Sequence, residues 1–184
     1  MAVYEASARL FEASQASVRP LTTVFLPICA GLAAAGAHDA LRRSLAKLST
    51  IALAAGAAAF LAANLVAEWA ILFVYGAAYA TSADVLRVHF AATPFVFLGT
   101  VALFHLTALR RERTALLCAA AGLGFNAALD LLLIPGHGPV GAAWATLAAE
   151  ATAAVGLQAT AWLALAAAAG RDGRPPAVLA PENR

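Results

Sequence analysis

The amino-acid sequence predicts an all-α protein, a polytopic membrane helix bundle with about five transmembrane helices. Of its 184 residues, 62% are apolar and 12% are charged, whereas a soluble domain has about 25% charged residues. The mean hydropathy is +0.80. The charges are bunched, so that several windows approach the ~20 uncharged residues that a hydrocarbon core requires. Together these observations exclude an ordinary soluble domain.

Five windows predict the helices in order. The windows are residues 20–38, 48–67, 88–109, 113–135 and 151–170. Four of the five carry no charge, and the remaining one, 113–135, is interrupted only by Arg113 and Asp130. Backbone groups in lipid must be hydrogen-bonded within their own segment, and alanine and leucine are strong helix formers. We therefore expect helices over residues 4–35, 45–74, 84–109, 113–134 and 139–169. The connections are short, so neighbouring helices should form antiparallel hairpins.

The chain divides into a transmembrane bundle, residues 1–170, and a polar tail, residues 171–184. Pro175, Pro176 and Pro181 prevent regular structure in the tail, which we expect to be disordered and cytoplasmic. At the end of the second helix Trp69, with Tyr75 and Tyr79 beyond it, is typical of the aromatic belt at a membrane interface.

The basic residues predict the orientation, because basic loops stay in the cytoplasm. Nine of them flank the first and third connections or lie in the tail: Arg42, Arg43, Lys47, Arg110, Arg111, Arg113, Arg171, Arg174 and Arg184. The opposite side has Arg87 in its loops and Arg9 near the outer end of the first helix. The N-terminus is therefore expected outside and the C-terminus in the cytoplasm, as an odd number of spans requires.

A polar stripe marks one face of the first predicted helix. At 100° per residue Glu5, Arg9, Glu12 and Arg19 fall within about 80° of one another. An arginine at a span centre costs roughly 2.5–3.5 kcal/mol, which cancels most of the apolar contribution of residues 20–38. We expect these four residues to line a hydrated substrate path. The structural alternative is that the first three form ion pairs on a solvated turn outside the membrane.

A second polar set lies on the fourth and fifth predicted helices. Asn126 and Asp130 are four residues apart and share a face. In an antiparallel hairpin centred near His137, Glu150 lies level with about position 125, so Asn126 and Glu150 should be near one another. Two interpretations stay open here. The set is either a hydrogen bond that locks the hairpin or a proton- or cation-responsive coupling site.

The remaining sequence features predict neither catalysis nor a cofactor. No catalytic triad, phosphate-binding loop or paired-carboxylate pattern occurs. His89 and His105 lack ligand partners in the sequence, so no metal is expected, and Cys29 and Cys118 are interpreted as small buried residues. A net charge of +2, in loop clusters, does not indicate nucleic-acid binding. We expect a protein that is not an enzyme.

Several phrases, in order, resemble the C-terminal half of the polysaccharide-biosynthesis flippases, in the superfamily of multidrug and lipid-linked oligosaccharide exporters. They occupy residues 4–10, 25–27, 72–79 with 85–87, 126–135 and 138–146. The most specific is a helix that begins near Asn126 and ends in Ile134-Pro135, followed by Gly138-Pro139-Val140-Gly141-Ala142-Ala143. The resemblance covers roughly residues 2–168.

The resemblance implies the function. Such flippases have two helical bundles around a polar cavity and move lipid-linked saccharides by alternating access, and this chain would match spans eight to twelve. It implies a fragment or truncated member in the bacterial cytoplasmic (inner) membrane, with membrane lipids, a lipid-linked saccharide, and a missing N-terminal bundle or another helical membrane subunit as partners. The alternatives are a multidrug-type exporter of the same fold and a small non-transporting membrane interaction protein.

Overall fold

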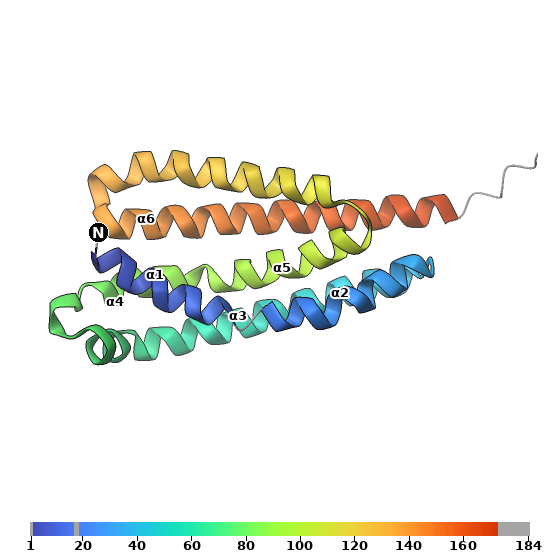
Figure 1. Ribbon diagram of the computed structural model, residues 1–184. Helices are drawn as coiled ribbons and strands as arrows, with labels where there is room; N and C mark the ends of the chain where they lie inside the picture. Colours follow the sequence, from blue (N-terminus) through green and yellow to red (C-terminus); the bar gives the residue numbers. More distant parts are fainter. Residues whose placement is uncertain (1, 17–18, 173–184) are drawn as a thin grey trace, which may run out of the picture.

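The structure is a bundle of long helices in a computed structural model that describes residues 2–16 and 19–172. Within those residues it contains helices and turns and no strand, as the predicted all-α class requires. The elements are α1 (Ala2–Gln15), α2 (Arg19–Ala34), α3 (His38–Tyr75), the short 3-10 helix η2 (Ala77–Tyr79), α4 (Ser82–Ala91), α5 (Thr93–Ala108) and α6 (Glu112–Asp172). Along the long axis of the bundle, α1 and α2 run in one direction, α3 returns, α4 and α5 run in the first direction again, and α6 goes back and then forward (Figure 1).

The prediction of one helix over residues 4–35 is wrong, because this segment forms α1 and α2. A proline inside a helix removes one backbone hydrogen bond and its ring clashes with the preceding turn. Pro20 instead lies in the first turn of α2, directly after Arg19, where no N–H is needed. Pro27 remains within α2. The polar stripe predicted on one helix is therefore divided between two.

The third predicted helix is also divided, at Ala92, into α4 and α5. Pro94 lies at the start of α5, and α3 approaches it closely at Gly56. A Cβ atom placed on Gly56 would lie 2.4 Å from the Cα atom of Pro94. A hydrogen at position 56 thus permits a contact between α3 and α5 that any side chain would prevent.

The fourth and fifth predicted helices are the two arms of α6, which folds back at Gly138 (Figure 1). Gly138 has φ 57° and ψ −137°, a backbone conformation that is essentially restricted to glycine. Three residues later, a Cβ atom on Gly141 would lie 2.5 Å from the carbonyl oxygen of Leu133. The Gly-Pro-Val-Gly phrase therefore makes the turn and brings the second arm against the first.

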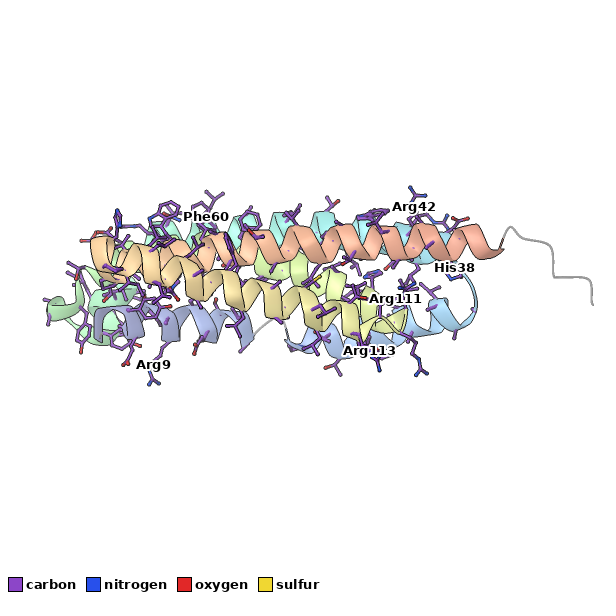
Figure 2. The ribbon with its side chains drawn as sticks, turned by 90° about the horizontal axis from the view of Figure 1, so that it is seen from above. Arg9, His38, Arg42, Phe60, Arg111 and Arg113 are labelled. Atoms are coloured by element: carbon purple, nitrogen blue, oxygen red, sulfur yellow. The ribbon has the colours of Figure 1, made fainter. Side chains whose placement is uncertain are left out.

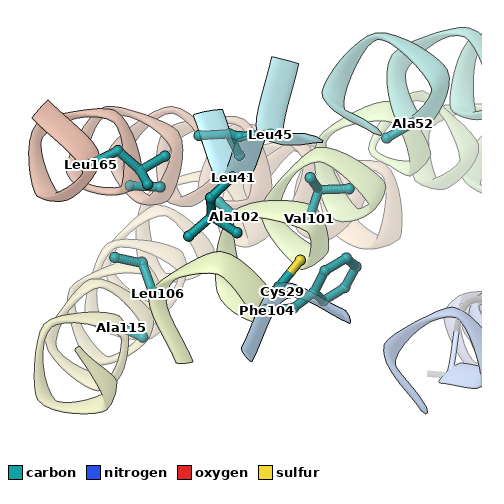
Figure 3. Close-up of a cluster of buried hydrophobic side chains, with 11 residues drawn as sticks. Cys29, Leu41, Leu45, Ala52, Val101, Ala102, Phe104, Leu106, Ala115 and Leu165 are labelled. Atoms are coloured by element: carbon teal, nitrogen blue, oxygen red, sulfur yellow. The ribbon is translucent and has the colours of Figure 1, made fainter. Parts of the chain in front are cut away.

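Helix α5 is at the centre of the bundle and packs against α3, α6 and α2. One buried cluster joins these four helices (Figure 3). Leu41 and Leu45 of α3, Leu106 of α5 and Leu165 of α6 are each at most 1% exposed. A second cluster near the other end contains Ala67, Ile71 and Leu86. Helix α1 packs mainly against α4.

Three helical segments are long and apolar enough to cross a membrane: His38–Tyr75, Ser82–Ala108 and Glu112–Ala169. Thr22–Ala34 is a shorter apolar helix. Large apolar side chains cover the outside, with Leu65 at 87% and Leu131 at 79% exposure, as on lipid-facing helices. Length and composition fit a membrane protein, whereas the number of crossings and their direction stay predictions.

Candidate functional site

A cavity lined mainly by small apolar residues, with three polar side chains among them, lies between the two arms of α6. Its volume is about 360 Å³, and the first arm contributes Asn126 while the second contributes Thr146 and Glu150. Small residues let the two arms approach closely here, since a Cβ atom on Gly122 would lie 3.2 Å from the Cβ atom of Ala153. The hairpin thus places Asn126 and Glu150 in the lining of the same cavity, one from each arm.

Asn126 connects the two arms through its side-chain amide. With the amide oriented to satisfy both neighbours, its nitrogen donates to Asp130 Oδ2 at 3.1 Å and its oxygen accepts from the backbone N–H of Thr146 at 3.3 Å. The other carboxylate oxygen of Asp130, Oδ1, is buried and has no hydrogen-bond partner. We call Asn126, Asp130, Thr146 and Glu150 the hairpin site.

The side chains of the hairpin site are two carboxylates, one hydroxyl and one amide, so the atoms that could bind a cation are all oxygens. Thr146 donates its hydroxyl to the carbonyl of Ala142 at 3.1 Å, so its oxygen lone pairs remain available. Carboxylate, amide, hydroxyl and carbonyl oxygens suit a proton or a hard cation rather than a soft metal. A buried carboxylate oxygen with no partner is costly in an apolar bundle, and either a proton or a cation would remove that cost.

The predicted polar stripe lies on the outside of α1. Glu5, Arg9 and Glu12 are all exposed, and Arg9 points away from the bundle (Figure 2). Arg19 begins α2, and its side chain lies outside the described residues. The structure therefore exposes the first three on the outside of α1.

A contact around His89 was not predicted from the sequence. Ser7, which is fully buried, donates to the carbonyl of Tyr4 at 2.8 Å, and its oxygen lies 3.2 Å from Nδ1 of His89. Because the one hydroxyl proton goes to Tyr4, Nδ1 of His89 is the donor to Ser7. The ring of Phe11 stacks on His89 with centroids 5.4 Å apart. His89 therefore fixes α1 on α4.

A second missed contact joins Cys29 of α2 to His105 of α5. The Cys29 sulfur is 3.7 Å from Nε2 of His105, and both residues are fully buried. Nδ1 of His105 is 2.8 Å from the carbonyl of Val101, which can only accept, so Nδ1 carries the proton and Nε2 accepts from the thiol. Neither residue has a sequence neighbour that could have signalled this pairing.

Gln158 gives the second arm of α6 its contacts with two other helices. Its side-chain nitrogen donates to Ser49 Oγ at 2.8 Å and to the carbonyl of Leu98 at 3.1 Å. Gln158 shares the face of the second arm that carries Thr146 and Glu150 in the sequence, but its partners lie in α3 and α5. It is a structural contact rather than a part of the hairpin site.

The site and the fold together define the class: a helical bundle with span-length apolar helices and a polar hairpin site. Within residues 2–16 and 19–172, no group of three or more His, Cys, Asp or Glu side chains is placed to hold a metal ion. No protein-family model, curated protein or solved structure matches the chain. Its function is therefore argued from the site.

Proposed function

We propose that the chain is part of a flippase that moves lipid-linked oligosaccharide or polysaccharide precursors across the bacterial cytoplasmic membrane. The observation that carries the proposal is the hairpin site, a carboxylate with one unpartnered oxygen among apolar, span-length helices. Ionisable groups at such positions mark ion or substrate pathways in membrane proteins. The resemblance of residues 126–146 to flippase phrases supports the same function.

In this proposal the hairpin site couples transport to a proton or a cation. Occupancy of Asp130 would change the contact between Asn126 and Thr146, and hence the packing of one arm of α6 on the other. The packing there is close, because a Cβ atom on Gly122 would lie 3.2 Å from the Cβ atom of Ala153. A change at the site would therefore move the arms relative to one another rather than be absorbed locally.

The substrate path is assigned to the α1 face and the start of α2. Glu5, Arg9 and Glu12 form an exposed polar face, and Arg19 adds a charge that no lipid-facing helix could hold cheaply. A guanidinium keeps its charge at any working pH and binds phosphate oxygens in pairs. These properties fit a lipid diphosphate. We propose that this face meets a second helical bundle or subunit.

The experiment deletes the gene in the cell that makes the protein and then reintroduces the wild-type gene or a variant. Deletion should lower surface polysaccharide and raise lipid-linked precursors in the inner leaflet, and wild-type protein should restore both. Asp130→Asn should fail to restore them at equal membrane abundance, because it replaces the carboxylate by a neutral amide. Asp84→Asn is the matched control, since Asp84 is exposed, bonds to Arg87 at 2.7 Å and is not part of the hairpin site.

Three outcomes would contradict the proposal. Unchanged precursors on deletion, together with greater drug accumulation, would indicate a multidrug-type exporter. Unchanged precursors and drug levels, with loss of a co-purifying membrane protein, would indicate a non-transporting interaction protein. Full restoration by Asp130→Asn would remove the hairpin site from the transport mechanism.

A further inference from the structure

A larger cavity lies at the other end of the first arm of α6, where α2, α5 and α6 meet. Its volume is about 700 Å³. One wall is apolar and is formed by α2 through Leu26, Ala30 and Ala33, while the rim carries Arg110 and Glu112 of the α5–α6 turn. A cavity that is apolar along a helix and charged at its mouth matches an amphiphile rather than a small polar solute.

Arg110 has an unusual backbone conformation at this rim. It is the one residue other than glycine with positive φ, 57°, among those the structure describes. Its N–H donates to the carbonyl of Thr107 at 3.0 Å, and that of Arg111 donates to Leu106 at 2.8 Å. This is the position after a helix end where glycine is usual. An arginine there adopts a strained backbone conformation, and Arg110 is one of the residues that line the cavity.

The end of the bundle around this cavity is basic. Six basic residues lie in the α2–α3 and α5–α6 regions against two acidic ones, Asp39 and Glu112; the basic ones are Arg42, Arg43, Lys47, Arg110, Arg111 and Arg113. Figure 2 shows Arg42, Arg111 and Arg113 at the same end as His38, with Arg9 at the opposite end. Basic pockets between helices at a membrane surface attract anionic lipid headgroups.

We propose that this cavity binds an anionic phospholipid, with its phosphate at Arg110 and an acyl chain along Leu26, Ala30 and Ala33. The phosphate oxygens would accept charge-assisted hydrogen bonds from the guanidinium. The acyl chain would cover apolar surface of α2 that is otherwise exposed. Free phosphate offers the same headgroup chemistry, but it would leave the apolar wall unfilled. The inference rests on membrane insertion and not on flippase activity.

The test titrates the purified full chain, in neutral detergent, with phosphatidylglycerol, phosphatidylethanolamine and inorganic phosphate, and counts bound lipid by native mass spectrometry. Phosphatidylglycerol should bind best. Arg110→Gln should weaken it by about fivefold or more, the loss of one charge-assisted contact. Arg113→Gln is the matched control, because it removes the same charge at the same end without lining the cavity, and should change binding by less than about twofold.

Two further variants separate binding from folding. Arg110→Gly should relax the turn at positive φ and still lose the lipid, which assigns the loss to the side chain in a folded protein. Ala30→Leu should block the apolar wall, and Ala54→Leu on the exposed face of α3 should not.

Equal losses in Arg110→Gln and Arg113→Gln would overturn the site in favour of diffuse charge attraction. Equal binding of the two lipids would overturn its preference for an anionic headgroup, because Glu112 can attract an ammonium group. Displacement of the lipid by inorganic phosphate alone would show a phosphate site. Each result is independent of saccharide transport, so failure here leaves the proposed function untouched.

Discussion

Gln158 connects its own helix to two others through a single side chain. It is half-buried and donates to Ser49 of α3 and to the carbonyl of Leu98 in α5. Interhelical hydrogen bonds in membrane proteins average about 0.6 kcal/mol and reach about 1.7 kcal/mol. Since two such bonds depend on one amide, the cost of its removal should be measurable.

Gln158→Leu should therefore lower the free energy of unfolding by about 1–2 kcal/mol, because it keeps the side-chain size and removes both donors. Denaturant titration in micelles, followed by circular dichroism, measures the change. Thr152→Val is the control, since Thr152 is exposed and bonds only to Ala148 of its own helix. An equal effect of the two substitutions would show that Gln158 contributes no interhelical stability.

His89 should decide whether α1 stays docked. His89→Ala removes the hydrogen bond to Ser7 and the ring contacts with Tyr4 and Phe11, which account for much of what fixes α1 on α4. We expect faster amide hydrogen exchange in α1 and unchanged exchange in α5. Val88→Ala, at a half-buried neighbouring position, should leave α1 protected. Unchanged protection of α1 in His89→Ala would contradict the role of the ring.

At the scale of elements, the turn of α6 depends on a missing side chain at Gly141. A Cβ atom there would meet the backbone of Leu133 at 2.5 Å and the side chain of His137 at 3.1 Å. Backbone cannot yield as a flexible side chain can, so the second arm would have to move away. Overpacking of this kind costs about 1–3 kcal/mol.

Gly141→Ala should therefore lower the yield of a disulfide between Gly122→Cys and Ala153→Cys, whose Cβ positions face one another across the arms. The measurement is gel mobility after mild oxidation, in a background with Cys29→Ser and Cys118→Ser. Gly136→Ala is the matched control because no atom lies within 4 Å of its Cβ position. Equal cross-linking in both variants would show that Gly141 does not set the approach of the arms.

Small residues also determine where α3 and α5 meet, yet the sequence could not identify which ones. Glycine and alanine are so frequent that a helix-packing pattern occurs along every span, and Gly56 has no local feature that distinguishes it from Gly31. Only the fold places Pro94 opposite Gly56, whereas no atom lies within 4 Å of the Cβ position of Gly31. A close approach depends on both helices, so the sequence of one helix alone does not reveal it.

At the scale of the whole molecule, the helical class and the hairpin of α6 could be predicted because they depend on local signals. Uncharged windows set the long helices, and the register of a short turn sets which residues of its arms are level, as at Asn126 and Glu150. Pro20 is a local signal for an interruption of the first predicted helix, because a proline inside a helix removes a backbone hydrogen bond. The contact of Cys29 with His105 joins residues 76 positions apart, so no sequence window contains both.

The orientation of the bundle is the prediction that involves every element at once. Arg42, Arg111 and Arg113 lie at one end of the bundle and Arg9 at the other (Figure 2), and the positive-inside rule predicts that the basic end faces the cytoplasm. Reporter fusions or cysteine labelling should place Ala2 and His137 outside and Arg43, Arg111 and Arg174 inside. The five predicted spans alternate in direction along the chain (Figure 1). A turn that lies on the opposite side of the membrane from the prediction would therefore also move every later turn to the opposite side. An external reporter at Arg111 with Ala2 also external would rule out the five-span arrangement and would place the phospholipid cavity in the outer leaflet.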